Sequence, residues 1–220
     1  MGFWKSVTPE ERRLLSSLGL SRNYPHGAII CSEGEAATHL FIILHGWVKV
    51  LSVTDNGQTI VLALRGDGDI VGDTAGATAG RRTATIEAIG VVHALIVDYD
   101  RFSSFLDTHS SASQAYRRMM ALRWSNTDEK WRQRAVTSGP QRFAGLLLDL
   151  ASQYGSQADS VVEMALPLSQ EELASLAGTS RATVARALGD WRRRGWLRTG
   201  QRRITLIDLA ALRRAAGPAG

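Results

Sequence analysis

The residues best suited to nucleic-acid chemistry lie near the C-terminal end of the 220-residue chain, at positions 180–186. This stretch reads Ser-Arg-Ala-Thr-Val-Ala-Arg and has the pattern of a helix that buries Val184 and leaves Ser180, Arg181 and Arg186 outside. The N-terminus of a helix carries free N–H groups and partial positive charge, which suit a phosphate. An arginine fork also reaches two acceptors on a guanine edge at once. The pattern therefore predicts binding to double-stranded DNA.

Basic residues on both sides of this helix favour the same chemistry. Positions 192–194, 202 and 203 are all arginine and would neutralise a phosphate backbone. A small helical interaction domain with a solvated basic face is the plainer alternative. We predict DNA contacts from Ser169, Thr179, Ser180, Arg181, Thr183, Arg186, Arg202 and Arg203.

A second candidate site lies in the first half of the chain. Gly72-Asp73-Thr74 is followed by Arg81-Arg82-Thr83, so a glycine turn precedes an arginine by ten residues. Free backbone N–H groups, a short polar turn and an arginine together make a pocket for an anion. Taken alone this signal is weak, because Gly-Asp turns and arginine pairs occur on many protein surfaces.

The predicted secondary structure that positions these residues changes from helix to strand along the first half of the chain. Residues 8–20 predict an amphipathic helix capped by Thr8. Short β-rich runs with glycine turns follow and predict a β-sandwich or barrel. These runs are 28–31, 40–44, 47–53, 60–64, 83–89 and 92–97, with a hairpin turn at Asp55-Asn56-Gly57.

Residues 99 to about 136 predict helix, and Met120, Trp124, Thr127 and Trp131 are spaced as a heptad seam. This seam packs either on its own β-domain or against the same helix of a second copy. Thr137-Ser138-Gly139-Pro140 then predicts a hinge, because glycine and proline stop a helix.

The C-terminal region predicts a second, mostly helical domain. Residues 142–154 form one helix, and Ser169 with Glu172 forms a capping box at the start of another. A tight turn at 177–179 leads to the helix from Ser180. Residues 196–199 and 204–207 then predict a two-stranded ribbon, which completes a winged helix-turn-helix.

Composition and charge narrow the functional classes. Hydrophobic residues make up 44% and charged residues 21%, values that exclude a disordered or collagen-like chain. Residues 1–114 hold nine basic and twelve acidic side chains, while the remainder holds 17 and nine. An acidic half joined to a basic half suggests two separate tasks. The N-terminus lacks the apolar run of a signal peptide and no stretch is long enough to cross a bilayer, so we expect a cytoplasmic protein.

Several motifs resemble the Crp/Fnr superfamily of bacterial transcription regulators over nearly the whole chain. Residues 27–30, 33–35, 40–50 and 66–72 are similar to the cyclic-nucleotide-binding β-roll of that family, and residues 170–174 and 180–184 to its DNA-binding domain. The resemblance implies an α+β fold with a β-roll (a double-stranded β-helix), a long dimerisation helix and a winged helix-turn-helix. The corresponding domains are 1–108, 109–137 and 138–220.

The resemblance also implies roles for individual residues of a cyclic-nucleotide site. Gly72 offers its backbone to the ligand, Arg82 pairs with the cyclic phosphate and Thr83 adds a hydroxyl. Asp73, with Thr74 beside it, stands where the family has a glutamate that holds the ribose. Arg123, Thr127 and Asp128 match positions on the long helix, with Thr127 near the base and Arg123 a partner for Asp73. Asp128 replaces the usual serine.

Cyclic AMP is the first candidate effector; another nucleotide and the absence of any small effector stay open. The recognition helix has Ala182 where the family has a glutamate, so we expect a half-site that differs from the usual one at one base pair. The implied partners are a palindromic operator in double-stranded DNA, a second copy of the chain, a nucleotide effector and RNA polymerase.

Other chemistries fit the sequence poorly. One cysteine, Cys31, cannot hold an iron–sulfur cluster, and we interpret it as a small buried hydrophobe. The five histidines are scattered and are interpreted as turn or surface residues rather than haem ligands. A cupin-like metalloenzyme would need a His-x-His pair, which the sequence lacks. We therefore expect no enzymatic activity, no metal and no cofactor. A ligand-independent regulator is the remaining alternative.

Overall fold

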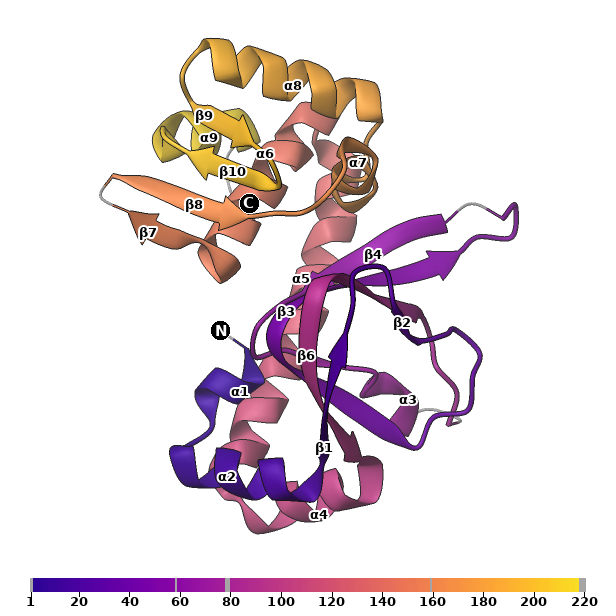
Figure 1. Cartoon of the computed structure of the whole chain (residues 1–220). Coiled ribbons are helices and arrows are strands. Elements are labelled where there is room, and N and C mark those ends of the chain that lie inside the picture. Colours follow the sequence, from indigo (N-terminus) through magenta and orange to yellow (C-terminus); the bar gives the residue numbers. More distant parts are fainter. Residues whose placement is uncertain (1, 58, 78–79, 159, 218–220) are drawn as a thin grey trace. The chain divides into compact units, whose positions relative to one another are not determined.

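The computed structural model describes residues 2–57, 59–77, 80–158 and 160–217, and at positions 76, 77 and 126–136 the backbone alone. The chain divides into two compact units, residues 1–126 and 127–220 (Figure 1). Each unit is described by itself below. The long helix α5 (Ser110–Val136) begins in the first unit and ends in the second.

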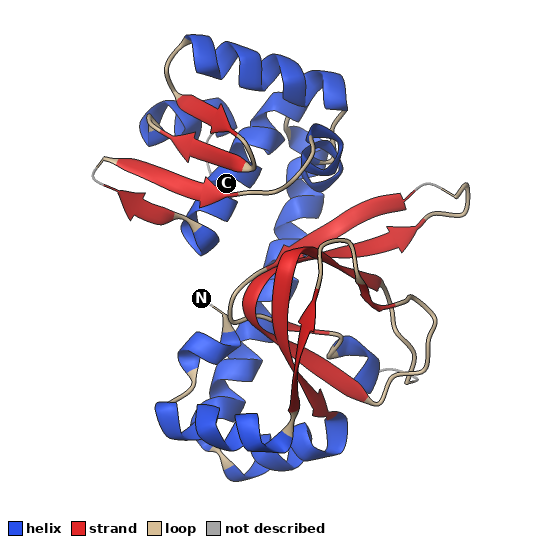
Figure 2. Ribbon diagram, viewed as in Figure 1, coloured by secondary structure: helices blue, strands red, loops and turns tan. Residues whose placement is uncertain are grey.

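The first unit is built on an antiparallel sheet (Figure 2). Its strands are β1 (Leu20–Tyr24), β2 (Ile29–Cys31), β3 (His39–Val53), β4 (Thr59–Arg65), β5 (Ile70–Val71) and β6 (Thr85–Asp98). The main order is β1-β6-β3-β4; β2 pairs with β6 and β5 with β3. The predicted hairpin turn joins β3 to β4, and the Gly57 amide donates to the Thr54 carbonyl at 2.8 Å. This is the β-roll expected from the sequence.

The two longest strands correct the sequence-based boundaries. We expected separate strands on either side of His45-Gly46 and of Gly90, whereas β3 and β6 run through these positions. Gly46 and Gly90 have φ values of 96° and 73°, and the β3–β6 register shifts beside Gly46. A glycine in the left-handed region bends a strand at a bulge without ending it. The glycines therefore curve the sheet instead of forming turns.

Along the chain, helices precede the strands of this unit, interrupt them before β6 and follow them. They are α1 (Phe3–Ser6), α2 (Pro9–Leu18), α3 (Thr74–Ala77), α4 (Tyr99–Thr108) and the start of α5. Thr8 caps α2 as predicted, because its hydroxyl accepts from the Glu11 amide while the Glu11 carboxylate accepts from the Thr8 amide. The region predicted to be one helical stretch from residue 99 breaks at His109, which separates α4 from α5.

One face of α5 packs on the core of the first unit. Ala112 and Met119 are buried there, and Tyr116 packs against the same cluster. The spacing of three and four residues places Arg123 on this face as well. Of the predicted seam, Met120 packs against the core, whereas Trp124 is 67% exposed. The side chains of Thr127 and Trp131 lie outside the described residues.

The second unit combines helices with a small antiparallel sheet. It contains α6 (Gly139–Tyr154), β7 (Ser156–Ala158), β8 (Val161–Ala165), α7 (Gln170–Ala177), α8 (Arg181–Arg193), β9 (Leu197–Gly200), β10 (Arg203–Leu206) and α9 (Leu209–Ala216). The strand order is β7-β8-β10-β9, so the predicted ribbon is half of a four-stranded sheet. Phe143 stacks on Trp191 at 5.5 Å between ring centres in its core.

The predicted hinge is shorter than expected. Gly139 and Pro140 do not lie in the break but form the first turn of α6, with Ser138 as the capping residue. Proline is well tolerated in a first helical turn because its missing N–H has no intrahelical partner there. None of the described helices has the length and apolar character needed to cross a bilayer.

Candidate functional site

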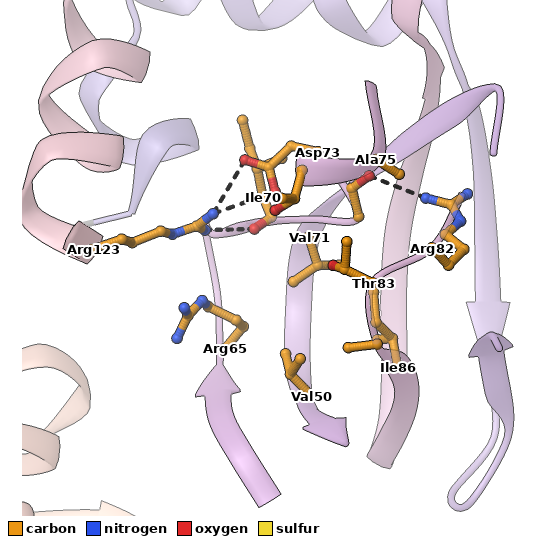
Figure 3. A pocket seen from close by; sticks show the side chains of 13 residues that line it. Val50, Arg65, Ile70, Val71, Asp73, Ala75, Arg82, Thr83, Ile86 and Arg123 are labelled. Atoms are coloured by element: carbon orange, nitrogen blue, oxygen red, sulfur yellow. Dashed lines mark hydrogen bonds and ion pairs between the residues drawn. The ribbon is translucent and has the colours of Figure 1, made fainter. Parts of the chain in front are cut away.

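A pocket opens in the first unit, and it contains the residues predicted to hold an anion. Strands β3, β4, β5 and β6, the segment after β5 with helix α3, the loop before β6 and helix α5 supply its walls (Figure 3). The lining residues are Val50, Arg65, Ile70, Val71, Gly72, Asp73, Thr74, Ala75, Arg82, Thr83, Ala84, Ile86 and Arg123. The structure thus brings together six of the predicted ligand residues.

Arg82 is a buried cation at one side of this pocket. It is 4% exposed, and its Nη1 donates to the carbonyl of Gly72 at 3.1 Å and to the hydroxyl of Tyr99 at 3.3 Å. The guanidinium also lies over the ring of Phe41, with Cζ 5.2 Å from the ring centre. In the part of the chain that the structure describes, no carboxylate forms an ion pair with it. A buried guanidinium with neutral neighbours is a favourable place for an anion.

Gly72 is required by this arrangement. Its φ of 74° belongs to the left-handed region, and a Cβ atom there would lie 2.5 Å from Nη1 of Arg82. Its carbonyl accepts from the Tyr99 hydroxyl as well as from Arg82. Any other side chain would therefore strain the backbone and displace the buried guanidinium.

Asp73 and Arg123 form an ion pair at the other side of the pocket, as predicted. Nη1 of Arg123 lies 3.2 Å from Oδ2 of Asp73, whose side chain is 3% exposed. The same guanidinium donates from Nη2 to the carbonyl of Ile70 at 2.5 Å, and the Tyr116 hydroxyl donates to Asp73 at 3.4 Å. Burial, and then the charge of Asp73, raises the pKa of Tyr116 to about 12. The pair ties α5 to the segment after β5.

The remaining predicted ligand residues differ in how far the structure describes them. Thr74 and Thr83 line the pocket with exposed side chains. Arg81 points elsewhere, because its Nη1 donates to the carbonyl of Gly34 at 2.7 Å. The side chains of Thr127 and Asp128 lie outside the described residues. Cys31 is buried as expected, and burial raises the pKa of its thiol.

Sequence reasoning missed four residues at this site. Phe41, Tyr99 and Tyr116 contact its charged groups, and Arg65 is part of its wall. The spacing of Ala112, Tyr116, Met119 and Arg123 was an available signal for Tyr116, since it marks a second helical face beside the predicted seam. Phe41 and Arg65 lie on distant strands, and Tyr99 begins α4 directly after β6, so their positions beside the site depend on how the strands pair.

The helix-turn-helix in the second unit follows the predicted capping pattern. Ser169 and Glu172 cap α7 reciprocally, with the Ser169 amide donating to the Glu172 carboxylate at 2.7 Å. Gly178 ends α7 with a φ of 60°. Ser180 then caps α8, because its hydroxyl accepts from the Thr183 amide at 3.2 Å. These caps set the angle at which α8 begins.

The outer face of α8 carries the predicted arginines. Arg181 and Arg186 are exposed, as is Ala182 between them. Nε of Arg181 lies 3.1 Å from a carboxylate oxygen of Glu171 on α7, and Nε of Arg186 donates to the carbonyl of Ala182. Val184 and Leu188 are buried on the opposite face, as expected. The exposed face is therefore polar and accessible to a partner.

The start of α6 lies directly beneath the turn of this motif. A Cβ on Gly139 would lie 2.2 Å from Oγ1 of Thr179 and 3.2 Å from Cγ2 of Thr183. Arg142 donates to the carbonyls of Ala177 at 3.1 Å and Gly178 at 2.8 Å, and also to the carbonyl of Thr137. One guanidinium thus connects the segment before α6 to the turn before α8.

The ribbon of β9 and β10 presents the remaining predicted contacts. Arg202 lies at its tip with a φ of 54°, and Arg203 pairs with Glu163 of β8 at 3.2 Å. Both arginines are exposed. Among the described residues, no cluster of three histidine, cysteine or acidic side chains is placed to hold a metal ion.

Comparison with known families agrees with both parts of the structure. Residues 21–109 match the model of the cyclic nucleotide-binding domain, and residues 141–215 match that of the Crp-like helix-turn-helix domain. A "CRP-like cAMP-activated global transcriptional regulator" of Mycobacterium tuberculosis is 31% identical over 215 residues, which cover 98% of this chain and 96% of the relative. The "Cyclic AMP receptor protein" of Thermus thermophilus is 26% identical over 210 residues, covering 96% and 94% of the two chains.

Solved structures share the fold. FixK2 from Bradyrhizobium japonicum superposes with a TM-score of 0.79 at 20% identity and covers 92% of this chain and 99% of its own. A CooA mutant from Carboxydothermus hydrogenoformans gives 0.79 at 22% identity, with coverage of 99% and 96%. The chain belongs to the CRP/FNR family, whose members are transcription regulators and not enzymes.

Proposed function

We propose that the chain is a homodimeric, sequence-specific DNA-binding regulator whose affinity for a palindromic operator is controlled by a cyclic nucleotide bound in the pocket. Cyclic AMP is the first candidate, since the 31% identical relative is described as cAMP-activated. The observation that carries the proposal is the buried guanidinium of Arg82, which is 4% exposed beside Gly72. Under this proposal residues 1–108 are the sensor, 109–137 the dimerisation helix and 138–220 the DNA-binding domain.

The pocket chemistry supports a cyclic phosphate diester. Its single negative charge would bind at Arg82, with the hydroxyl of Thr83 as an added donor and Thr74 at the rim. Asp73 would accept from a ribose hydroxyl, because its carboxylate lies in the same wall and is held by Arg123 at 3.2 Å. Thr127 and Asp128 are proposed to face the base. A charge-assisted hydrogen bond in a buried site is about twice as strong as a neutral one.

The exposed surface of the second unit supports DNA binding. Arg181 and Arg186 are proposed to contact base edges from α8, while Ser169, Thr179, Ser180 and Thr183 contact phosphates near the helix N-termini. Arg202 and Arg203 would contact the backbone from the ribbon. Because Ala182 replaces a glutamate, the half-site should differ from that of the family at one base pair.

The helix α5 supports a dimer. Leu122 and Trp124 are 52% and 67% exposed on it, and apolar side chains of this size are usually covered. A parallel pair of α5 helices would cover them and place two recognition helices for a palindrome. We also propose a cytoplasmic location and contact with RNA polymerase.

Control by the nucleotide requires that it bind one arrangement of the protein better than another. The proposed route runs from Asp73 through the Arg123 ion pair into α5, and from there to the segment before α6. Arg142 would carry a change at Thr137 to the turn before α8, because it hydrogen-bonds both.

The test is operator binding with and without cyclic AMP, for the wild type and for Arg82→Ala. We expect the nucleotide to change the affinity of the wild type at least about tenfold, which corresponds to about 1.4 kcal/mol of coupling, and to leave Arg82→Ala unchanged. Arg81→Ala is the matched control, because this neighbouring arginine is exposed and bonds to Gly34 outside the pocket. It should respond as the wild type does.

The ligand-independent alternative makes the opposite prediction. Calorimetry would show no binding of cyclic AMP or cyclic GMP, and the protein would bind its operator tightly without either. That result would contradict the sensor part of the proposal while leaving the DNA-binding part intact.

A further inference from the structure

The two arginines on the outer face of α8 are restrained at the same atom but by different groups. Nε of Arg181 lies 3.1 Å from Oε1 of Glu171 on α7, whereas Nε of Arg186 donates to the backbone carbonyl of Ala182 at 3.3 Å. In the part of the chain that the structure describes, no group accepts a hydrogen bond from the Nη atoms of either side chain. Both terminal nitrogens of each fork are therefore available to a partner outside the chain.

Glu171 reaches Arg181 across the turn of the helix-turn-helix. It lies in the first turn of α7, beside Glu172, and Figure 1 shows this helix next to the start of α8. The Glu172 carboxylate accepts from the Ser169 amide and completes the cap of α7. An acidic residue in the first turn also interacts favourably with the helix dipole, but that effect requires no ion pair with another helix. Glu171 therefore extends from α7 to the face of α8 that is proposed to contact DNA.

This ion pair contributes little to the stability of the fold. The side chains of Arg181 and Glu171 are 67% and 62% exposed, and exposed pairs add little to the free energy of unfolding because solvent screens them. Binding to DNA would change these surroundings, because water is displaced from the groove and the interaction between the two charges becomes stronger. The pair is therefore placed to affect DNA binding more than folding.

Pairing with a carboxylate changes which acceptors the guanidinium attracts. A phosphate oxygen is anionic, and a carboxylate 3.1 Å from Nε both offsets the positive charge of Arg181 and repels the phosphate. The O6 and N7 atoms of guanine carry no net charge, and an arginine fork still engages both with hydrogen bonds. Contacts to phosphate carry no sequence information, whereas contacts to a base edge do. Glu171 would therefore weaken the contact that every DNA sequence offers and preserve the one that guanine offers.

We propose that Glu171 is a specificity-determining residue of the DNA-binding surface, which orients the fork of Arg181 toward a guanine edge and lowers the affinity for DNA that lacks this base. A repulsive contact against the wrong partner is a common source of specificity. The inference rests on the proposed function, because it takes Arg181 to contact a base. Arg186 is restrained by a neutral carbonyl, so its charge also attracts phosphates.

The test is DNA binding by the full chain at a fixed concentration of cyclic AMP, for the wild type, Glu171→Gln and Glu171→Asp. The probes are a duplex that the wild type selects from a randomised pool, the same duplex with single-base changes in each half-site, and a duplex of unrelated sequence. For Glu171→Gln we expect the preference for guanine at one position to fall about fivefold or more, and the affinity for the unrelated duplex to rise about two- to fivefold. Aspartate keeps the charge on a shorter side chain, so Glu171→Asp should lose the preference and keep the low affinity for unrelated DNA.

Two controls separate orientation from charge. Glu163→Gln removes a carboxylate from another exposed pair, with Arg203 of the ribbon at 3.2 Å, and should raise the affinity for all duplexes alike. Arg181→Ala removes the side chain that reads the base, so the addition of Glu171→Gln to it should not change the guanine preference further. An unchanged melting temperature shows that the Glu171 variants are folded, since the pair is exposed.

Four results would overturn the proposal. If Glu171→Gln tightens binding to all duplexes equally, as Glu163→Gln does, Glu171 acts through general charge and the proposed function stands. If Glu171→Gln lowers the guanine preference in the Arg181→Ala background as well, the carboxylate acts through another group. If Arg181→Ala selects the same sequence as the wild type, Arg181 reads no base. If the wild type selects no sequence at all, the DNA-binding part of the proposed function fails, and this inference fails with it.

Discussion

Arginine serves both units of the molecule, but in opposite environments. In the pocket, Arg82 is 4% exposed, and the side chain of Arg123 is 19% exposed beside a carboxylate that is almost fully buried. In the helix-turn-helix unit, the side chains of Arg181 and Arg193 are 67% and 75% exposed, and their ion pairs with Glu171 and Asp190 lie in solvent. Solvent therefore screens the arginine charges weakly in the pocket and strongly on the helix-turn-helix unit.

The difference has a physical consequence for binding. A buried guanidinium interacts strongly with one anion in one geometry, because its neighbours are fixed and water is excluded. Exposed guanidinium groups contribute weakly one by one, and their sum follows the number of phosphates that they neutralise. The pocket is suited to selecting a small ligand, whereas the DNA surface is suited to attracting a polyanion whose sequence is read by a few side chains.

The largest expected difference between the two units is in how strongly salt weakens the binding at each. Raising monovalent salt from about 50 mM to about 200 mM should weaken operator binding at least about 100-fold, because counterions are released from several phosphates. Nucleotide binding should weaken less than about threefold, since Arg82 is shielded from solvent. Fluorescence anisotropy and calorimetry over the same salt series measure the two slopes. Equal slopes would contradict the contrast between buried and exposed arginines.

Removal of one carboxylate from each unit should have unequal effects on stability. Asp73→Ala leaves Arg123 with a desolvated charge, and we expect a loss of about 2 kcal/mol in the free energy of unfolding of the first unit. Glu163→Ala breaks the exposed pair with Arg203 and should cost less than about 0.5 kcal/mol. Urea unfolding of the full chain measures both.

A double variant sharpens this stability comparison. Arg123→Met in the Asp73→Ala background removes the guanidinium that has lost this carboxylate and should recover part of the loss. No recovery would mean that Asp73 stabilises the fold through Tyr116 and not through the ion pair.

A substitution in the recognition helix should have a smaller effect, on which base is preferred in the operator. Ala182→Glu supplies an acceptor for the amino group of cytosine, and each such base contact is worth about 1–3 kcal/mol of discrimination. Operator selection with the variant should therefore change the preferred base at one position of each half-site, with nucleotide affinity unchanged. Selection of the usual family half-site by the wild type with undiminished preference would show that Ala182 has no such effect.

The smallest expected effect is a pH dependence at Tyr116. Burial and the charge of Asp73 raise its pKa from 10.0 to about 12. The neutral phenol is therefore favoured in the folded state, and its contribution to stability is complete below pH 10 and is lost as the pH rises toward 12. Ultraviolet titration of the wild type against Tyr116→Phe isolates this residue. In Asp73→Asn its pKa should fall, and an unchanged value would assign the shift to burial alone.

The features that sequence analysis predicted best are local. The helix cap at Thr8, the capping box at Ser169 and the hairpin turn before β4 depend on residues within four positions of one another, and all three are present. Glycine was the main source of error, since it permits both a turn and a bulge. At Gly46 the pairing of β3 with β6 decided in favour of a bulge.

The pocket was predicted less completely, because its parts come from distant segments. The resemblance to a family supplied Arg82 and the Asp73–Arg123 pair, and the structure confirms that these two charges are in contact. Phe41, Tyr99 and Arg65 have no such motif. Strand register places Phe41 and Arg65 beside the site, and Tyr99 reaches it from the start of α4, directly after β6. A single sequence does not encode such register in a short pattern.

The three carbonyls bonded by Arg142 have a consequence for how motion passes through the second unit. Its guanidinium donates to Thr137 before α6 and to Ala177 and Gly178 at the end of α7, so we expect these segments to move together. A small rotation of these segments would then displace the far end of α8 by a larger distance, because that end of the 13-residue helix lies about 20 Å from its first turn. Arg142 would thus lie at the pivot of this rotation, and the recognition helix would undergo the largest displacement.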